Sequence, residues 1–398
     1  MTARLLFVHE TYGRLAGAEQ NILVTAPRLA QTFDLAFLHW QRSGRDEADF
    51  DTLFRRRYQV PFDQSDNAVR ERTQQVLEQE QPDLVYVHKC ISVGLLQALC
   101  DSGLPLVRME HDHDIYCMRS YKYFPWTRRI CRRRAGWHCV FPCLAFMRRD
   151  RTRGRFGIKY VSYRRQRELI RLNQRFDAIF VVTRYMRDEL IRQGFDPARI
   201  HIFPPVPKPR TEPFESTFSD RNLIVYAGQI VRGKGVDCLI RAMALLKQPA
   251  RLVVLGGGSH RPFCEKLVRT LGLADRVRFP GFVSQEQLAD YYSNATMVVV
   301  PSVWPEPIAT VGLEVMRYGL PVVAFDSGGI SDWLNDGQNG FLVPWMDVEA
   351  MADRMDRLLA DKKTARRMGA CGRELVNSQF DFNDYINSLT TALCDLMS

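Results

Sequence analysis

Two glutamates stand eight residues apart in the stretch EPIATVGLE, from Glu306 to Glu314, around an otherwise apolar run. Proline lies on both sides of Glu306, and a residue before a proline is pushed away from helical angles, so we expect Glu306 in a rigid turn. Pro307 suits the first position of a helix, where its missing N–H would have no partner anyway. The sequence therefore predicts a helix from about Ile308 to Arg317. It carries Glu314 on a mostly apolar surface, where a carboxylate needs a partner.

Several nearby loops carry residues that suit a bound diphosphate. The strand NLIVYAG ends in Gly228, and the loop QIVRGKG after it supplies Arg232 and Lys234, cations that pair well with pyrophosphate oxygens. Three glycines from Gly256 onward follow the strand LVVL, at a point where the backbone must pass close to a ligand. The N–H groups at the start of the Ile308 helix offer a further anion site. Each feature alone is weak, but together they predict a nucleotide-diphosphate site.

In such a site the two glutamates have distinct tasks. Glu314, held within the helix, can accept hydrogen bonds from a ribose diol, and Glu306 can reach the hydroxyl groups of a transferred group. The alternative is that both are solvated surface carboxylates, which is the commoner role of an isolated pair.

Two series of alternating strands and helices must position these residues. The first begins with LLFVH at Leu5, and the second begins with NLIVYAG at Asn222. The stretch from Pro204 to Glu215 has four prolines in six residues and is typical of a linker. The pattern predicts an α/β fold of two doubly wound, Rossmann-like domains that face each other across a cleft, with ligands at the carboxyl ends of the strands.

The domain boundaries that we predict are as follows. An acceptor-binding domain covers 1–207 and includes a basic, cysteine-containing insertion at about 113–172. A donor-binding domain covers 215–380, and a C-terminal helix at 381–398 packs back on the first domain.

Length and composition exclude several classes of protein. The 398 residues are 46% hydrophobic, which is enough for two large cores. No apolar run approaches the ~20 residues of a membrane-spanning helix. The start, MTARLLFVHE, is typical of a buried strand rather than a signal peptide, because its apolar run is short and no small-residue cleavage site follows. We expect a cytoplasmic protein, or one that is peripheral on the inner face of the cell membrane.

The formal charge of +10 is concentrated in one segment. From Arg119 to Arg175 there are eighteen lysines and arginines against two acidic residues, a net of +16, so the rest of the chain is at about −6. Tryptophans and tyrosines lie among these cations, as suits an anionic membrane surface. A polyanionic substrate or RNA is an alternative, and so is a solvated face with aromatic residues packed beneath it.

Four of the ten cysteines lie in the same segment, at Cys117, Cys131, Cys139 and Cys143, with His111, His113 and His138 close by. In a reducing compartment, clustered cysteines favour metal binding over disulfides. The spacing has no CxxC pair, however, so three interpretations stay open: a structural zinc or iron–sulfur site, free buried thiols, or disulfides.

The region from Leu223 to Val343 resembles the donor domain of glycosyltransferase family 4, the group 1 glycosyl transferases of retaining GT-B type that are related to glycogen synthase. The matching stretches, in the family's order, are YAGQIVRGKGVDCLIRA, VVLGGGSH, VRFPGFVSQEQLADYYSNATMVVVPS and EPIATVGLEVMRYGLPVVAFDSGGISDWLNDGQNGFLV. Upstream, HETYGRLAGAEQNI resembles the family's first glycine loop, with Ala16 where a second glycine is usual. MEHDHDIYC resembles the strand end that carries the active-site histidine, which places His111 at that position.

The resemblance implies a role for each matching residue. Glu314 would bind the donor ribose, Glu306 would touch the sugar near its reacting end, and Lys234 would hold the pyrophosphate. The residues assigned in this way to catalysis are His111, Glu306, Lys234 and Arg232. Those assigned to donor binding are Gly17, Gly228, Gln229, Gly256, Phe282, Val283, Pro307, Ile308, Ala309, Thr310 and Glu314.

The chain departs from the family's pattern at two positions. Gln229 stands where the family usually has an arginine, and Arg232, three residues on, is the candidate to supply the missing charge. Asp332 stands where glutamate is commoner. Some members carry cysteines in this order after the His111 strand end, which favours a joint metal or redox role for them.

The activity implied is transfer of a sugar from a UDP- or GDP-sugar with retention of configuration. No carboxylate need act as nucleophile, because the departing phosphate can take the acceptor's proton on the same face, and no metal or other cofactor is needed for catalysis. The expected acceptor is a lipid-linked or cell-envelope saccharide, presented at an anionic membrane surface through residues 119–175; a soluble acceptor is the alternative.

Two other classes of protein share some of these sequence features. A nicotinamide-dependent oxidoreductase needs GxGxxG after a first strand, and neither HETYGRLAG nor GGGSHR has that spacing. A nucleic-acid-binding or regulatory protein on a degenerate transferase fold is the more serious alternative because of the basic segment, but we expect no nucleic-acid partner.

Overall fold

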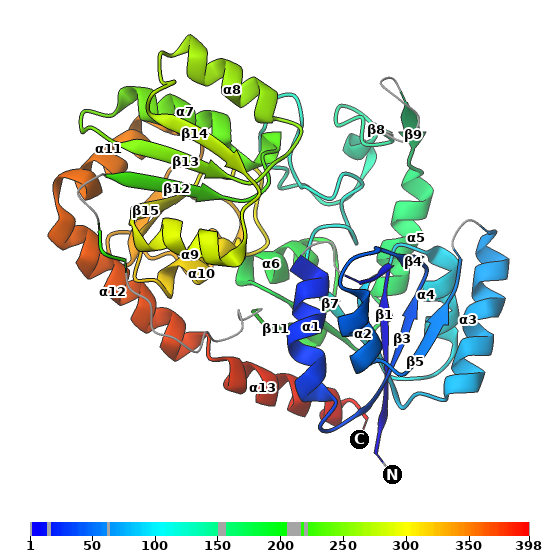
Figure 1. Ribbon diagram of the computed structural model, residues 1–398. Helices are drawn as coiled ribbons and strands as arrows, with labels where there is room; N and C mark the ends of the chain where they lie inside the picture. Colours follow the sequence, from blue (N-terminus) through cyan, green and yellow to red (C-terminus); the bar gives the residue numbers. More distant parts are fainter. Residues whose placement is uncertain are drawn as a thin grey trace. The chain divides into compact units, whose positions relative to one another are not determined.

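The computed structural model describes residues 2–13, 17–61, 64–149, 157–204, 216–218 and 222–397 (Figure 1). The chain forms two compact units. The first comprises Met1–Lys122, Cys131–Pro205 and Asn383–Ser398, and the second comprises Tyr123–Ile130 and Val206–Phe382. Each unit has its own parallel sheet with helices, as the alternating pattern predicts.

The sheet of the first unit has seven parallel strands in the order β11-β10-β7-β6-β1-β3-β5. These strands are β1 (Arg4–His9), β3 (Asp34–His39), β5 (Arg56–Gln59), β6 (Leu84–Lys89), β7 (Leu106–Glu110), β10 (Ala178–Val181) and β11 (Ile200–Ile202). The helices are α1 (Gly17–Leu29), α2 (Glu47–Leu53), α3 (Asp66–Glu80), α4 (Val93–Asp101), α5 (Tyr163–Asn173), α6 (Arg184–Arg192) and α13 (Phe382–Asp395), with 3-10 turns η1 (Trp137–Cys139) and η3 (Pro197–Arg199). Two small two-stranded sheets pair β2 (Thr11–Tyr12) with β4 (Gln41–Arg42) and β8 (Met147–Arg149) with β9 (Ile158–Tyr160).

The central strands of this sheet are continuous apolar runs because helices cover both of their faces. Phe7 on β1, for example, is fully buried, stacks on Phe37 of β3 at 6.4 Å and meets Tyr86 of β6 edge-on at 5.3 Å. The chain builds outward from β1 to β5 on one side and from β6 to β11 on the other. The topological switch point therefore lies between β1 and β6, where α/β sheets bind ligands.

The last helix, α13, belongs to the first unit although it follows the second in sequence. The Nδ2 of Asn21 on α1 donates to the hydroxyl of Tyr385 at 3.5 Å, and the Nη1 of Arg28 donates to Oδ1 of Asn383 at 3.0 Å. The Tyr385 ring also contacts Phe203 at 6.4 Å between centroids. The chain thus returns to the first unit after α12.

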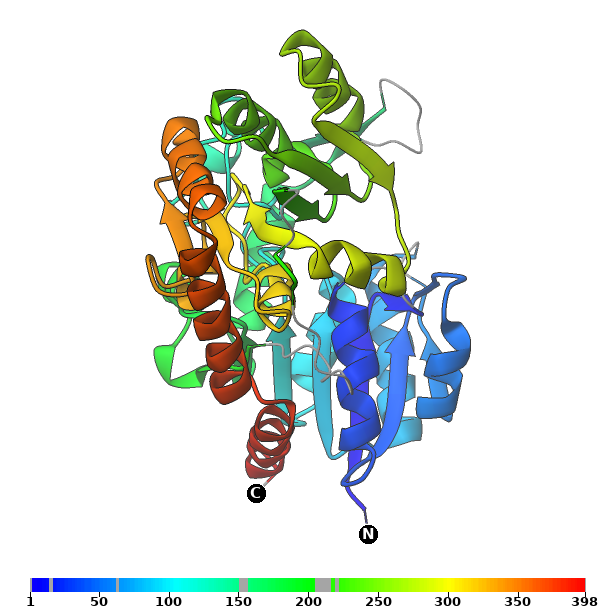
Figure 2. The same cartoon turned by 60° about the vertical axis from the view of Figure 1, so that its left-hand side comes forward.

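The second unit has a six-stranded parallel sheet in the order β14-β13-β12-β15-β16-β17. Its strands are β12 (Leu223–Ala227), β13 (Arg251–Leu255), β14 (Val277–Gly281), β15 (Ala295–Val300), β16 (Val322–Phe325) and β17 (Gly340–Val343). Its helices are α7 (Val236–Leu245), α8 (Arg261–Thr270), α9 (Gln285–Ser293), α10 (Thr310–Met316), α11 (Val348–Ala360) and α12 (Lys362–Gln379), with 3-10 turns η4 (Arg232–Lys234) and η5 (Gly329–Asp332). Helix α11 packs on β15, β16 and β17, and α12 runs beside it (Figure 2).

The predicted boundaries differ from these units in one informative place. We expected the whole basic insertion, about 113–172, in the first domain, whereas Tyr123–Ile130 packs with the second unit. Of the predicted linker, only Pro204 lies within the described residues. Among those residues no helix is both long and apolar enough to cross a lipid bilayer.

Candidate functional site

Glu306 is the centre of a compact polar group at the carboxyl end of β15. Its side chain is buried, and its Oε1 atom accepts hydrogen bonds from Lys234 Nζ at 2.8 Å, Trp304 Nε1 at 2.7 Å and Ser302 Oγ at 2.5 Å. Burial alone would raise the pKa of Glu306, but the Lys234 charge and these hydrogen bonds bring it below its ordinary value. The group therefore holds an ionised carboxylate beside an ammonium.

The Lys234 ammonium has a second contact in this group. It lies 5.3 Å from the centre of the Trp304 ring, where a cation is attracted to the ring face. Two independent interactions thus hold the Lys234 nitrogen next to the glutamate. A cation that is fixed in this way can meet an incoming diphosphate with little further ordering.

The backbone around Glu306 is fastened to the loop that follows β16. The Glu306 carbonyl accepts from Gly329 N at 2.7 Å, and Glu306 N donates to Ser327 O at 3.3 Å. Gly328, between these partners, has φ +70°, and a Cβ there would lie 2.3 Å from the Glu306 carbonyl oxygen. Only glycine allows this close approach of the two loops.

Backbone hydrogen bonds join the glycines at the carboxyl ends of β12, β13 and β14. Gly228 N donates to Leu255 O at 3.0 Å, and Gly256 N donates to Gly281 O at 2.7 Å. Gly256 has φ +114°, and a Cβ there would lie 2.1 Å from the Gly228 carbonyl oxygen. The residue after Gly228, Gln229, is exposed. We predicted that the backbone at these glycines passes close to a ligand. In the structure the glycine loops pass close to one another, at the sheet edge where α/β sheets bind ligands.

The two predicted phosphate cations have different partners. Both lie in the turn η4, and Lys234 points to Glu306, whereas Arg232 Nη1 donates to the Pro125 carbonyl at 2.7 Å. Gly233, between them, could not carry a side chain, because a Cβ there would lie 2.2 Å from the Trp304 ring. The RGKG sequence thus packs directly on the tryptophan.

The helix that carries Glu314 starts later than predicted. Helix α10 begins at Thr310 rather than Ile308, and Ala309 before it has left-handed backbone angles (φ 57°). Pro307 is therefore not its first residue. The Ile308 carbonyl accepts a hydrogen bond from the indole of the fully buried Trp333, which a regular first turn would not leave available. Glu314 lies on α10, half-buried, as expected, and Thr310 is exposed.

Phe282 and Val283, the predicted nucleobase contacts, follow β14. The Phe282 side chain is 86% exposed, which is unusual for a phenylalanine of a folded domain. Its ring lies against Gly257, where an added Cβ would stand 2.8 Å away. An exposed aromatic face beside a glycine loop is a suitable stacking platform for a base.

His111 follows β7 in the first unit and is stacked with His88 of β6. Their rings are 5.3 Å apart, and His88 Nδ1 lies 3.1 Å from His111 Nε2. Burial, together with the nearby His9, Arg108 and Lys89, lowers the pKa of His111 to about 3. The imidazole is therefore neutral near pH 7 and offers one donor and one acceptor.

Family models match most of the chain. The model described as Glycosyltransferase Family 4 matches residues 15–206, and the one described as Glycosyl transferases group 1 matches residues 208–375. The chain belongs to glycosyltransferase family 4.

Curated relatives of this family 4 chain act on different acceptors. It is 36% identical over 217 residues to D-inositol 3-phosphate glycosyltransferase of Xylanimonas cellulosilytica, covering 50% of this chain and 52% of the relative. It is 28% identical over 248 residues to the GDP-mannose-dependent alpha-(1-6)-phosphatidylinositol monomannoside mannosyltransferase of Mycobacterium tuberculosis, covering 58% and 63%. The chain thus spans about half to two thirds of the length of these relatives.

Solved structures show the same fold. HepE of Anabaena, crystallised with UDP and glucose, superposes with a TM-score of 0.72 over 99% of this chain and 100% of that chain, at 16% identity. The fold of the family 4 chain is accordingly GT-B, as predicted.

The first glycine loop of the family pattern is only partly described. Gly17 opens α1, whereas Ala16 and the two residues before it lie outside the described residues. A Cβ at Gly17 would meet no atom of the described residues within 4 Å, so none of these residues requires glycine there. Its predicted role in donor binding stays a prediction.

The four cysteines of the basic segment give no support to a metal centre in this family 4 chain. All four are free and half-buried, and burial raises the pKa of the Cys139 thiol to about 11. Within the described part of the chain, no group of three or more His, Cys, Asp or Glu side chains is placed to hold a metal ion. The described residues therefore give no support to the zinc or iron–sulfur site, one of the three interpretations of the sequence.

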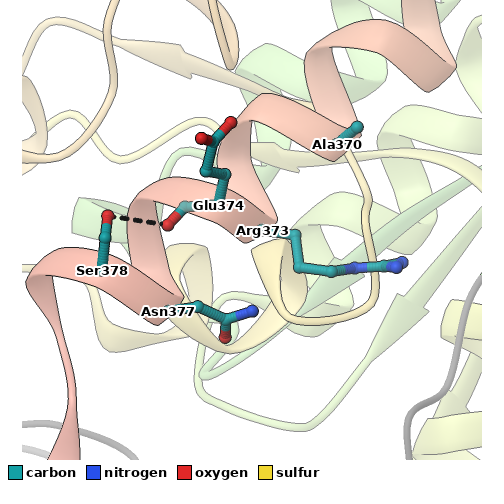
Figure 3. A pocket seen from close by; sticks show the side chains of 5 residues that line it. All are labelled: Ala370, Arg373, Glu374, Asn377 and Ser378. Atoms are coloured by element: carbon teal, nitrogen blue, oxygen red, sulfur yellow. Dashed lines mark hydrogen bonds between the residues drawn. The ribbon is translucent and has the colours of Figure 1, made fainter.

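A hollow on the surface of α12 is lined by none of the predicted site residues. It is lined by Ala370, Arg373, Glu374, Asn377 and Ser378 (Figure 3). Its five side chains come from successive turns of one helix, and the Ser378 hydroxyl bonds back to the Glu374 carbonyl at 2.8 Å. None of them was a candidate for donor binding.

Sequence reasoning missed Ser302 and Trp304. Both are donors to Glu306, and Trp304 also packs on Gly233 and Lys234. The signal was a tryptophan two residues before the glutamate, in PSVWPEP. Asp332, which departs from the family's usual residue, closes the turn η5.

Proposed function

We propose that this protein transfers a sugar from a UDP- or GDP-sugar to a saccharide acceptor, with retention of anomeric configuration. The observation that carries this proposal is the group of Glu306, Lys234 and Trp304 at the carboxyl edge of the second sheet. Family membership supports it. HepE, a structure of the same fold, was crystallised with UDP.

The chemistry asks the protein mainly to stabilise charge. A sugar with oxocarbenium character and a departing diphosphate develop in the transition state, and fixed cations lower their free energy. Lys234, held by Glu306 and Trp304, is the proposed partner of the diphosphate, and Arg232 adds a second cation. Glu306 accepts hydrogen bonds from the sugar hydroxyls through its carboxylate.

The nucleoside is bound at the opposite end of the donor in this proposal. Glu314 on α10 accepts hydrogen bonds from the ribose diol, and the exposed Phe282 ring stacks on the base. Backbone groups of the loops at Gly228 and Gly256 line the diphosphate, because glycine has no side chain to keep the ligand away from them.

His111 is proposed to hydrogen-bond with the reacting sugar as a neutral imidazole. Its low pKa excludes a charged form near pH 7, so it donates or accepts a hydrogen bond rather than supplying a positive charge. The leaving phosphate takes the acceptor's proton on the same face, so that no carboxylate acts as a nucleophile. The scheme requires no metal ion.

The acceptor is proposed to be lipid-linked and reached at an anionic membrane surface. In the basic segment, Trp137, Phe141 and Tyr160 are 80%, 78% and 73% exposed. Arg132–Arg134 are exposed as well. Exposed rings beside cations suit the headgroup region of a bilayer. The mycobacterial relative is named for a phosphatidylinositol-linked acceptor.

The first experiment is a calorimetric titration with UDP, GDP, ADP and dTDP. A nucleotide at a hundred times its Kd also stabilises the protein by ~2.7 kcal/mol, which a thermal shift detects. The nucleotide sugars of the best ligand are then tested for turnover, and the anomeric configuration of the product is read by NMR. Failure of all four nucleotides to bind would refute the donor site.

Glu314→Ala tests the ribose contact within the same experiment. We expect nucleotide affinity to fall about tenfold, because a charge-assisted hydrogen bond is lost. Glu349→Ala, an exposed glutamate in the first turn of α11, is the matched control and should keep wild-type affinity. Equal affinity of Glu314→Ala and wild type would remove Glu314 from the site.

A further inference from the structure

A hairpin from the basic segment forms part of the second unit. The chain leaves the first unit after Lys122 and returns at Cys131. Between these points Tyr123 and Ile130 form an antiparallel bridge, and Phe124 N donates to Arg129 O at 2.9 Å. We call Tyr123–Ile130 the 123–130 hairpin.

The hairpin is anchored by one buried arginine. Arg128 Nη1 lies 3.0 Å from Asp237 Oδ2 on α7 and 3.7 Å from Cys238 Sγ, and both charged side chains are less than a tenth exposed. Burial would raise the pKa of Asp237, but His260 and Arg128 lower it below its ordinary value. Arg128 also has φ 60°, a left-handed backbone angle that residues other than glycine seldom adopt. A specific contact, not backbone preference, therefore fixes this residue.

The anchored hairpin touches two residues of the candidate site. The Pro125 carbonyl accepts from Arg232 Nη1 at 2.7 Å. The Tyr123 ring meets the Trp304 ring edge-on at 6.3 Å between centroids. Trp304 in turn donates to Glu306 and lies beneath the Lys234 ammonium. The contacts thus lead from a buried ion pair to the cations of the η4 turn.

We propose that the 123–130 hairpin is a positioning element of the donor site and that Arg128 is its positioning residue. Held by Asp237, the hairpin orders Arg232 and Trp304 before the donor binds. Ordering a long side chain costs free energy on binding, so an arginine that is already fixed binds a diphosphate more tightly. The guanidinium has five N–H donors, and the Pro125 carbonyl uses one of them while it directs the rest. The inference rests on the proposed nucleotide-sugar function.

Arg128→Met is the main test. It keeps the apolar stem and removes the anchor, and we expect the Kd of the nucleotide that wild type binds best, UDP or GDP, to rise about tenfold. The KM of the sugar donor should rise in parallel, while the KM of the acceptor stays within about twofold. Arg128→Lys keeps a cation opposite Asp237, and its nucleotide Kd should lie between those of wild type and Arg128→Met. Arg129→Met, an exposed arginine of the same hairpin, is the matched control and should match wild type.

Tyr123→Ala guards against a failure to fold, since it leaves no buried charge. It should weaken nucleotide binding about threefold at an unchanged acceptor KM, with exposed Tyr121→Ala as its control. Folded Arg128→Met or Tyr123→Ala protein with the wild-type Kd would overturn the inference while the proposed function stands. If Arg128→Met does not fold, Tyr123→Ala alone decides. Absence of nucleotide binding in wild type would refute the proposed function and, with it, the inference.

Discussion

At the scale of single residues, one carboxylate oxygen organises the candidate site. Glu306 Oε1 accepts from an ammonium, an indole and a hydroxyl, and all three donors come from the loops after β12 and β15. The sequence predicts Glu306 and Lys234 as candidate site residues but does not predict their pairing. Partners that are 72 positions apart in sequence meet only because β12 and β15 are neighbours in the sheet.

Glu306→Gln should reduce kcat by about a hundredfold or more. The substitution removes the negative charge that is proposed to stabilise the positive charge developing on the sugar in the transition state. The donor KM should change much less, and steady-state kinetics separate the two effects. Ser302→Ala removes only one of the three hydrogen bonds to the Glu306 carboxylate, from an uncharged donor, and should lower kcat only about fivefold. A kcat for Glu306→Gln within twofold of wild type would exclude Glu306 from the chemistry.

The same carboxylate predicts a pH dependence of stability. The folded-state pKa of Glu306 lies below its ordinary value of 4.5, so the unfolded chain binds the proton more tightly. Its stabilisation is fully present above that ordinary value and is lost as the pH falls through the folded-state pKa. The Tm difference between wild type and Glu306→Gln, measured from pH 7 to pH 3, should therefore shrink towards the acid end. A difference that is constant with pH would contradict the ion pair.

At the scale of elements, the apolar strands of both sheets follow from the sequence, but the edge strands of the first sheet do not. The sequence RRYQ of β5 alternates between half-buried and exposed positions at the end of the first sheet. An edge strand with one side exposed to solvent alternates polar and apolar residues, so its sequence has no continuous apolar run that would predict a strand. The same reason hides the short edge strand β11, whose last two residues are exposed.

The start of α10 shows how packing overrides local preference. Pro307 favours a helix beginning beside it, yet Trp333 takes the Ile308 carbonyl and the helix begins at Thr310. A buried indole must satisfy its N–H, and this carbonyl is its partner. The loop from Glu306 to Ala309 therefore has a conformation that local sequence rules do not predict.

Gly312→Ala tests this packing. A Cβ at Gly312 would lie 2.1 Å from the Trp333 ring, so either the ring or α10 must move. We expect a loss of ~1–3 kcal/mol in the free energy of unfolding, measured by urea denaturation, together with weaker nucleotide binding. Gly17→Ala, where a Cβ meets nothing within 4 Å, is the stability control and should stay within about 0.5 kcal/mol of wild type. Wild-type stability of Gly312→Ala would show that Trp333 is not closely packed on the helix.

At the scale of the whole molecule, the basic segment contributes to both units. The chain passes from one unit to the other at four places, two of which flank the 123–130 hairpin. We expected the whole insertion in the first domain. A sequence shows where an insertion begins but not which unit it packs against. The buried Arg128–Asp237 pair decides that question.

Vesicle binding tests the proposed membrane surface. We expect sedimentation with phosphatidylserine vesicles and not with phosphatidylcholine vesicles, since each basic residue near the surface contributes about 1 kcal/mol only when lipids are anionic. Binding should fall steeply with salt. Replacing the exposed Trp137, Phe141 and Tyr160 by serine should weaken it about tenfold or more, whereas replacing exposed Phe263 on α8 should not. RNA binding in the absence of vesicle binding would favour a nucleic-acid partner instead.

The sequence by itself determined the alternation of strands and helices, the division into two Rossmann-like halves and the short list of charged residues near the glycine loops. These follow from local periodicity and from residue types, which need no distant partner. Tertiary structure alone decided that Glu306 pairs with Lys234 and Trp304, that α10 starts at Thr310, and that Arg128 anchors a hairpin beside Arg232. Each of these depends on side chains brought together from distant loops, where burial makes a partner obligatory and only the fold determines which partner is near.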